Sequence, residues 1–340
     1  MEHGLSGTQS KKSKGQFYTT TNPFHNQLFI KWFNSIPMAV KEERPFLEPF
    51  AGANNIVQMM LDLSHKNKWE CFDIDPNPDA KTPFVVLRRD TLQDFPSGYR
   101  IAITNPPYLA KNSATRDGLA FPDCEFDDLY KFALGVMLGK VDYVAAIVPE
   151  SFVTSSLFHD RLYGIATLTC RMFDDTECPV CLALFVPKGT KTQEDDFVYY
   201  KGNSEVGTYK ALKKAVPLQA MTSNPWKFNK PDGEIGLYAV DGTKSKSIRF
   251  VKGSEIPSTQ IKTSSRSVTK IGGLPKGLSA DEVIKEANII LRSFRSTTED
   301  VFLTSFKGLR EDGDYRRRLD FSMARQVLNL SVEKIRARSV

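Results

Sequence analysis

The chain has 340 residues, of which 41% are hydrophobic and 25% are charged, and its formal net charge at pH 7 is +6. This balance is typical of a soluble globular protein with room for two domains, and no apolar run is long enough for a membrane span. The N-terminus lacks the apolar core of a secretory signal, and five scattered cysteines favour reduced thiols in the cytoplasm. The composition therefore argues against a membrane protein and against a disulfide-stapled secreted domain.

The charge is unevenly distributed along the chain. Residues 1–190 carry 19 Lys and Arg against 22 Asp and Glu, whereas residues 191–340 carry 27 against 18. Within the second part, residues 201–280 alone hold 14 against 5. Such a basic block is typical of a polyphosphate-binding surface, but a lysine-rich solvated surface has the same composition. The charge alone leaves both interpretations open.

The first half of the chain alternates between strand and helix patterns. Residues 1–14 are polar and basic, and we expect a disordered tail there. Helices are predicted over 25–36 and 126–138 from the spacing of apolar residues. Predicted strands begin at residue 46 and cover 69–76, 85–87, 101–103, 143–149, 168–173 and 180–186, the last two as an antiparallel hairpin at the sheet edge. This alternation predicts a doubly wound α/β sheet.

Polar side chains follow four of these strands at the point where each strand ends. Gly52 and Asn54 lie in a small-residue loop and can both adopt positive φ. Asp73 is placed to accept hydrogen bonds from ribose hydroxyls, and Asp90 from an adenine amine, although Asp73 also fits a plain surface turn before a proline. Asn105 follows the fourth strand. Because ligands of open α/β sheets bind at the carboxyl ends of the strands, the four ends together predict a nucleotide-type site.

The fourth strand is followed by Thr104-Asn105-Pro106-Pro107-Tyr108. Two prolines fix φ and keep the residues before them out of the helical region, so the chain leaves the strand as a stiff loop. The side chain of Asn105 and the carbonyl of Pro106 can hold one small polar group, while Tyr108 offers a flat apolar face. This suits a planar ring held by its exocyclic amine, and a proline-rich turn remains the alternative.

The second half of the chain lacks the alternation. Short β-like runs are separated by Asp-Gly and Lys-Gly turns, and helices are predicted over 280–291, capped by Ser279, and over 321–335. We therefore predict a catalytic domain over 15–190 and a mixed α+β domain over 191–340. Cys178 and Cys181 have the spacing of a zinc pair, but no second pair accompanies them, so we expect no metal site.

Taken in order, these motifs resemble the N6-adenine DNA methyltransferases of the γ motif order, in which the donor and catalytic motifs precede a target-recognition domain. The resemblance covers residues 15–187 and rests on these segments: Gly15–Thr19, Glu48–Asn54, Asp73, Asp90, Asn105–Tyr108 and Val148-Pro149. It implies a Rossmann-like domain with a mostly parallel seven-stranded sheet, and S-adenosylmethionine as the methyl donor.

The resemblance also implies a role for each matching residue. Donor contacts fall on Tyr18, Thr19, Glu48, Gly52, Asp73, Asp90 and Asn105; the catalytic loop is Asn105, Pro106 and Tyr108; Tyr108 and Phe173 would stack on the target base. Asn54 departs from the pattern, because the donor loop usually has a second glycine there. Asparagine tolerates the left-handed region better than other non-glycine residues, so we expect the loop to survive.

The implied substrate is double-stranded DNA, whose target adenine must be flipped out of the helix to be reached. We expect a bacterial or phage-encoded cytoplasmic monomer that needs no membrane, with a cognate restriction endonuclease as a candidate partner. RNA adenine methylation, protein glutamine methylation and a catalytically degenerate nucleic-acid-binding module are the alternatives. The glutamine enzymes carry a helical domain before the donor loop, whereas here 47 residues precede Glu48 and a basic segment follows Lys188, which favours nucleic acid.

Overall fold

The computed structural model describes residues 21–77, 82–169, 172–173, 178–191, 196–217, 223–257, 259 and 265–338. Tyr18 and Thr19, two of the expected donor-contacting residues, lie outside these ranges. The chain divides into two compact units, Met1–Glu205 and Val206–Val340. The division therefore falls after Glu205, beyond residue 190, where the sequence suggested a boundary.

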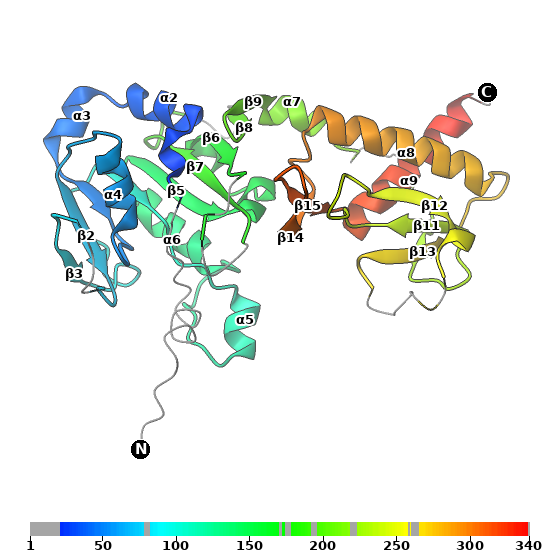
Figure 1. Ribbon diagram of the computed structural model, residues 1–340, viewed down its shortest axis with the longest axis horizontal. Helices are drawn as coiled ribbons and strands as arrows, with labels where there is room; N and C mark the ends of the chain where they lie inside the picture. Colours follow the sequence, from blue (N-terminus) through cyan, green and yellow to red (C-terminus); the bar gives the residue numbers. More distant parts are fainter. Residues whose placement is uncertain are drawn as a thin grey trace, which may run out of the picture. The chain divides into compact units, whose positions relative to one another are not determined.

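Unit 1 is built on a single twisted sheet (Figure 1). Its strands are β1 (Phe46–Glu48), β2 (Trp69–Asp73), β3 (Val86–Arg88), β4 (Ile101–Thr104), β5 (Tyr143–Pro149), β6 (Leu162–Thr167), β7 (Val180–Phe185), β8 (Val198–Lys201) and β9 (Ser204–Thr208). They are arranged in the order β3-β2-β1-β4-β5-β7-β6-β8-β9. Strands β1 to β5 pair in parallel, and β7 runs antiparallel to both β5 and β6. The mostly parallel α/β sheet predicted from the sequence is confirmed, and β8 and β9 extend it.

The hairpin predicted at the sheet edge was wrong in two respects. Its first strand is β6, at Leu162–Thr167, and this strand ends before residue 168, where the predicted strand begins. It is also internal, because β8 pairs in parallel with β6 on the side away from β7. Gly164 allows β8 to pair at this position: a Cβ here would lie 2.9 Å from the carbonyl oxygen of Val198 on β8, so only glycine permits this close approach.

The helices of unit 1 follow the predicted apolar periodicity. The helix expected over 25–36 is α2 (Gln27–Ser35), which buries Leu28, Phe29, Trp32 and Phe33. The other elements are η1 (Pro23–His25), α3 (Met38–Glu43), α4 (Asn55–Asp62), α5 (Lys111–Arg116), α6 (Leu129–Leu138), η2 (Glu150–Thr154) and η3 (His159–Arg161). Figure 1 shows α5 projecting away from the sheet, on a long excursion between β4 and α6.

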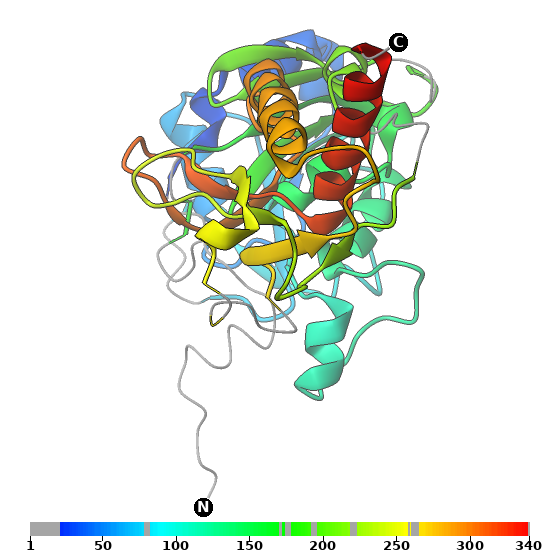
Figure 2. The same cartoon turned by 90° about the vertical axis from the view of Figure 1, so that its right-hand side faces the viewer.

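Unit 2 has the mixed α+β architecture predicted from the sequence. A four-stranded antiparallel sheet has the order β10-β13-β11-β12, and β14 and β15 form a separate hairpin. The elements are α7 (Tyr209–Lys214), β10 (Lys227–Phe228), β11 (Ile235–Tyr238), β12 (Arg249–Lys252), η4 (Gly253–Glu255), β13 (Val268–Gly272), α8 (Ala280–Thr297), β14 (Thr304–Leu309), β15 (Tyr315–Arg318) and α9 (Phe321–Arg338). Figure 2 shows α8 and α9 side by side. Helix α8 begins at the predicted cap, Ser279, in a capping box with Glu282.

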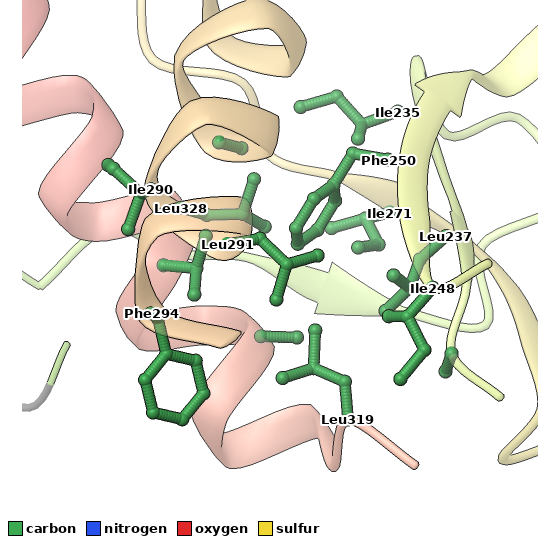
Figure 3. Packing of buried hydrophobic residues seen from close by; sticks show 14 of the residues in the cluster. Ile235, Leu237, Ile248, Phe250, Ile271, Ile290, Leu291, Phe294, Leu319 and Leu328 are labelled. Atoms are coloured by element: carbon green, nitrogen blue, oxygen red, sulfur yellow. The ribbon is translucent and has the colours of Figure 1, made fainter. Parts of the chain in front are cut away.

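The core of unit 2 lies between this sheet and the two long helices. Figure 3 shows side chains of the strands pointing toward side chains of α8 and α9. The contributing residues include Ile235, Leu237, Phe250 and Ile271 from the strands and Ile290, Leu291, Phe294 and Leu328 from the helices. One face of the sheet is therefore committed to the core. Among the described residues of the whole chain, no helix is both long enough and apolar enough to cross a membrane.

Candidate active site

A cavity of about 760 Å³ lies in unit 1 at the carboxyl ends of β1, β2, β3 and β4. Gly52, Asp73, Asp90 and Asn105 all line it. The sequence placed these residues at four successive strand ends, and the fold brings them to one wall. The volume falls within the range of about 300–1,000 Å³ that is usual for small-molecule and cofactor sites.

The loop after β1 has the backbone conformation that the sequence predicted. Gly52 has φ 51° and Asn54 has φ 63°, so both occupy the left-handed region. Asn54 is fully buried and is absent from the cavity wall; its amide nitrogen donates to Thr82 Oγ1 at 2.6 Å. Asn54 therefore anchors the loop from behind and keeps its side chain out of the cavity.

Asp73 links this loop to the end of β2. One carboxylate oxygen accepts a hydrogen bond from the backbone N–H of Gly52 at 2.8 Å, and the other accepts from the N–H of Asp75 at 2.8 Å. The side chain is 5% exposed and lines the cavity. Because an ionised carboxylate offers about four acceptor positions, Asp73 can hold both loops and also accept from ligand hydroxyls.

Asp90 is fixed by a turn after β3. Its carboxylate accepts from the backbone N–H groups of Leu92 at 3.1 Å and Gln93 at 3.3 Å. The neighbouring Thr91 is buried, and its hydroxyl donates to the carbonyl of Pro49 at 2.8 Å. This bond links the Asp90 turn to the loop after β1, so it fixes the two parts of the cavity wall relative to each other.

Glu48 lies behind the loop and is absent from the cavity wall. Its Oε1 accepts from the backbone N–H of Phe50 at 3.0 Å and from the hydroxyl of Thr104 at 2.5 Å. Its Oε2 is buried and has no hydrogen-bond partner among the described residues. Burial raises the pKa of this carboxyl to about 8, and the nearby charge of Asp73 contributes in the same direction. Glu48 is therefore protonated at neutral pH and supports the loop from below.

The loop after β4 presents Asn105 and Pro107 to the cavity, whereas Pro106 is buried beside them. The hydroxyl oxygen of Tyr108 lies 2.5 Å from Asn105 Oδ1 and 2.7 Å from the carbonyl oxygen of Ile147 on β5. Burial raises the pKa of the Tyr108 phenol well above its ordinary value, so it keeps its proton. The amide of Asn105 is thus connected through Tyr108 to the centre of the sheet.

The two residues expected to stack on a target base lie together, but in the interior. Tyr108 is 8% exposed and Phe173 is fully buried, and neither belongs to the described cavity wall. Their rings meet edge to face with centroids 6.1 Å apart, and Tyr130 packs edge-on against Tyr108 at 6.2 Å. Base stacking therefore stays a prediction, and it requires a face of Tyr108 to become uncovered.

Sequence reasoning missed much of the apolar wall. Residues Leu119, Ala120, Phe121 and Pro122 line the cavity from the segment after α5, together with Leu129 and Phe132 near and on α6. Ile74 also lines it although its side chain is 52% exposed, which is unusual for a large apolar residue. The segment has no helical or strand periodicity; its one signal is a short apolar run inside a polar loop.

Among the described residues, no three His, Cys, Asp or Glu side chains cluster closely enough to hold a metal ion. Cys178 and Cys181 are free thiols. Burial raises the pKa of Cys178 to about 11 and that of Cys181 well above its ordinary value. Both thiols therefore keep their protons at neutral pH.

No family model matches this chain, and no curated protein matches it. Solved structures that match include a putative class I S-adenosylmethionine-dependent methyltransferase from Listeria monocytogenes, at 12% identity and TM-score 0.39, over 59% of this chain and 68% of that one. A DrdV–DNA complex matches at 14% identity and TM-score 0.44, over 58% of this chain and 29% of that one. A modification subunit of a putative type I restriction enzyme from Vibrio vulnificus matches at 15% identity and TM-score 0.39, over 58% of this chain and 48% of that one. This chain thus spans less than half of the latter two, and at such identities and TM-scores the case for function rests on the site.

Proposed function

We propose that the protein is an S-adenosylmethionine-dependent DNA methyltransferase that acts on the exocyclic amine of adenine. One observation carries the proposal: Gly52, Asp73, Asp90 and Asn105 come from four different strand ends and line one cavity. The order of these residues along the chain is the order of the donor and catalytic motifs that the sequence resembles.

The cavity fits the adenosyl part of the donor. Asp73 would accept from ribose hydroxyls and Asp90 from the adenine amine, while the exposed Ile74 offers an apolar surface for a flat ring. Arg88 and Arg89 also line the cavity, and each forms an ion pair, Arg88 with Asp75 and Arg89 with Asp94. When bound, the donor would supply the electrophilic methyl group.

The catalytic contribution of the chain is to polarise and orient the amine. The adenine amine is a poor nucleophile because its lone pair is delocalised into the ring. Asn105 Oδ1 and the carbonyl of Pro106 would accept its two hydrogens and draw the nitrogen toward tetrahedral geometry. Fixed dipoles then meet the positive charge that develops on nitrogen. An amide does this without removing a proton from the amine.

Unit 2 offers a surface suited to a polyanion. In a sheet, alternate residues face opposite sides, and directly paired residues share a side. Since Leu237 and Ile271 face the helices, Tyr238, paired with Arg249, and Lys227, paired with Gly272, face away. The Arg249 guanidinium lies 4.5 Å from the centre of the Tyr238 ring. Cations interleaved with an aromatic ring are typical of nucleic-acid contacts, and within these four strands no outward-facing residue is acidic.

The proposal is tested by incubating the purified protein with isotope-labelled donor and, separately, duplex DNA, RNA and a protein extract. The nucleosides are then separated by mass spectrometry. We expect label in N6-methyladenine from duplex DNA, and none with the Asn105→Ala variant. Label confined to RNA or to protein would establish one of the alternatives. Failure of the donor to bind in calorimetry would identify a catalytically degenerate module. Sequencing that detects methylation would then give the target sequence.

A further inference from the structure

The hydroxyl of Tyr108 lies within hydrogen-bond distance of two acceptor oxygens but has only one proton to donate. The Tyr108 hydroxyl lies 2.7 Å from the carbonyl oxygen of Ile147 and 2.5 Å from Asn105 Oδ1. A phenol has one proton and can donate to only one of these two oxygens. The carbonyl of Ile147 can only accept, whereas the amide of Asn105 can present either an acceptor or a donor to the phenol, so the proton is assigned to Ile147. The other contact would then join two oxygens without a hydrogen between them, which is repulsive at this distance.

Reversing the amide of Asn105 removes the conflict. The oxygen and nitrogen of an asparagine amide are told apart by the hydrogen bonds they make, and the contact with Tyr108 favours nitrogen on that side. The amide then donates from Nδ2 to the phenol oxygen, and the phenol donates to Ile147. Every polar atom in the chain of bonds has a complementary partner. The amide oxygen consequently turns to the opposite side.

We propose that Tyr108 is a positioning residue whose hydroxyl orients the Asn105 amide so that Oδ1 faces the cavity as a hydrogen-bond acceptor. The inference rests on the proposed function, because an acceptor at this point is what the adenine amine needs. It assigns Tyr108 a task distinct from base stacking: the task depends on the hydroxyl, whereas stacking depends on the ring.

The surroundings of Tyr108 are rigid enough for this task. The ring is 8% exposed and is held edge-on by Tyr130 and Phe173. Ile147 lies in the middle of β5, where it pairs with Leu182 of β7. The hydroxyl is therefore fixed with respect to the centre of the sheet, and it transmits that position to the side chain of Asn105.

The test compares two hydroxyl deletions in neighbouring buried tyrosines. Tyr108→Phe keeps the ring and removes the bond to Asn105, so we expect kcat for methyl transfer to fall about tenfold, which is the value of roughly one hydrogen bond. KM for DNA and donor affinity should stay within about twofold. Tyr130→Phe is the matched control, because its ring packs on Tyr108 but it is not among the cavity-lining residues. An unchanged kcat in Tyr108→Phe, or an equal loss in Tyr130→Phe, would overturn the inference.

A second measurement separates orientation from general support. In an Asn105→Asp background both side-chain oxygens can accept, so no hydroxyl is needed to select one of them. Adding Tyr108→Phe there should reduce kcat much less than it does in the wild-type background. An equal reduction in both backgrounds would show that Tyr108 merely stabilises the loop.

A third measurement does not depend on activity. In the wild type, the Asn105 side-chain N–H should be protected from hydrogen exchange by its bond to Tyr108, and nuclear magnetic resonance should show faster exchange in Tyr108→Phe but not in Tyr130→Phe. An exchange rate that is the same in all three proteins would refute the amide orientation. A wild type that shows protection but transfers no methyl group would instead count against the proposed function alone.

Discussion

The carboxylate of Asp73 accepts a hydrogen bond from the backbone N–H of Gly52 at 2.8 Å. This bond joins the end of β2 to the loop after β1, two segments that are separated in sequence and adjacent in the sheet. Because Asp73 also lines the cavity, a ligand that binds its carboxylate also acts on the loop. Asp73 and the loop after β1 are therefore one coupled unit.

Replacement of Asp73 should consequently weaken donor binding strongly. Asp73→Ala removes an acceptor for two ligand hydroxyls and for Gly52, and hydrogen bonds to a charged group contribute about 1.5–3 kcal/mol each. We expect donor affinity in calorimetry to fall by at least about a hundredfold. Asp75→Ala is the comparison, because this cavity-lining carboxylate is half exposed and its ion pair with Arg88 contributes only about 0–1 kcal/mol. Unaltered affinity in Asp73→Ala would remove the assignment.

Glu48 should make the stability of the protein depend on pH. Its pKa is raised from an ordinary 4.5 to about 8, so between these values the unfolded chain is ionised there while the folded protein keeps the proton. The unfolded state then binds fewer protons, and the free energy of unfolding falls as pH rises, by at most about 1.4 kcal/mol per pH unit from this group. Glu48→Gln should abolish this component. Denaturant titrations between pH 5 and pH 8 measure it, and parallel profiles for the two proteins would contradict it.

Asn105→Ala should abolish methyl transfer while the protein still binds both ligands. Removing one preorganised dipole from a reacting centre typically lowers kcat by about 10²–10³-fold. Duplex DNA binding should largely persist, because its phosphate contacts are assigned to unit 2. Single-turnover kinetics give the chemical step, and fluorescence anisotropy gives DNA affinity. A near wild-type rate would show that the amine is activated in some other way.

Asn54 should be replaceable by glycine but not by alanine. A left-handed residue other than glycine or asparagine costs about 1–2 kcal/mol. Both replacements lose the bond to Thr82, so the strain of the left-handed backbone is what should distinguish alanine from glycine. Asn54→Gly keeps the backbone conformation and should retain donor affinity, because the Asn54 side chain does not line the cavity. Thermal unfolding and donor calorimetry of both variants test this, and equal behaviour of the two would contradict it.

The sequence predicts the polar part of the site because strand ends in a parallel sheet are fixed by local patterns. Gly52, Asp73, Asp90 and Asn105 each lie at the carboxyl end of a short strand or in the loop that follows it, so their convergence follows from topology. The apolar wall could not be predicted in this way. Phe121 reaches the cavity from a long excursion with no periodicity, and its position depends on tertiary packing.

Two further features depend on interactions between distant residues. Gly164 interrupts the pattern expected of a strand, yet it lies within β6. Glycine is needed there because β8 lies too close to leave room for a side chain. The burial of Tyr108 is also invisible in the motif, since it results from Tyr130 and Phe173, which are remote in sequence. A local sequence pattern therefore indicates the chemistry of a side chain, whereas its exposure depends on residues that are distant in sequence.

The outward face of the unit 2 sheet should control DNA affinity through charge. Lys227 and Arg249 are exposed on this face, whereas Lys285 is exposed on α8, which packs against the other face. If both residues bind phosphates, the double variant Lys227→Ala/Arg249→Ala should bind DNA more weakly for all sequences. The slope of log affinity against log salt concentration should fall by about 0.9 for each phosphate that the variant no longer neutralises. Lys285→Ala is the matched control and should leave affinity and slope nearly unchanged. An unaltered slope in the double variant, or an equal change in the control, would assign DNA binding to another surface.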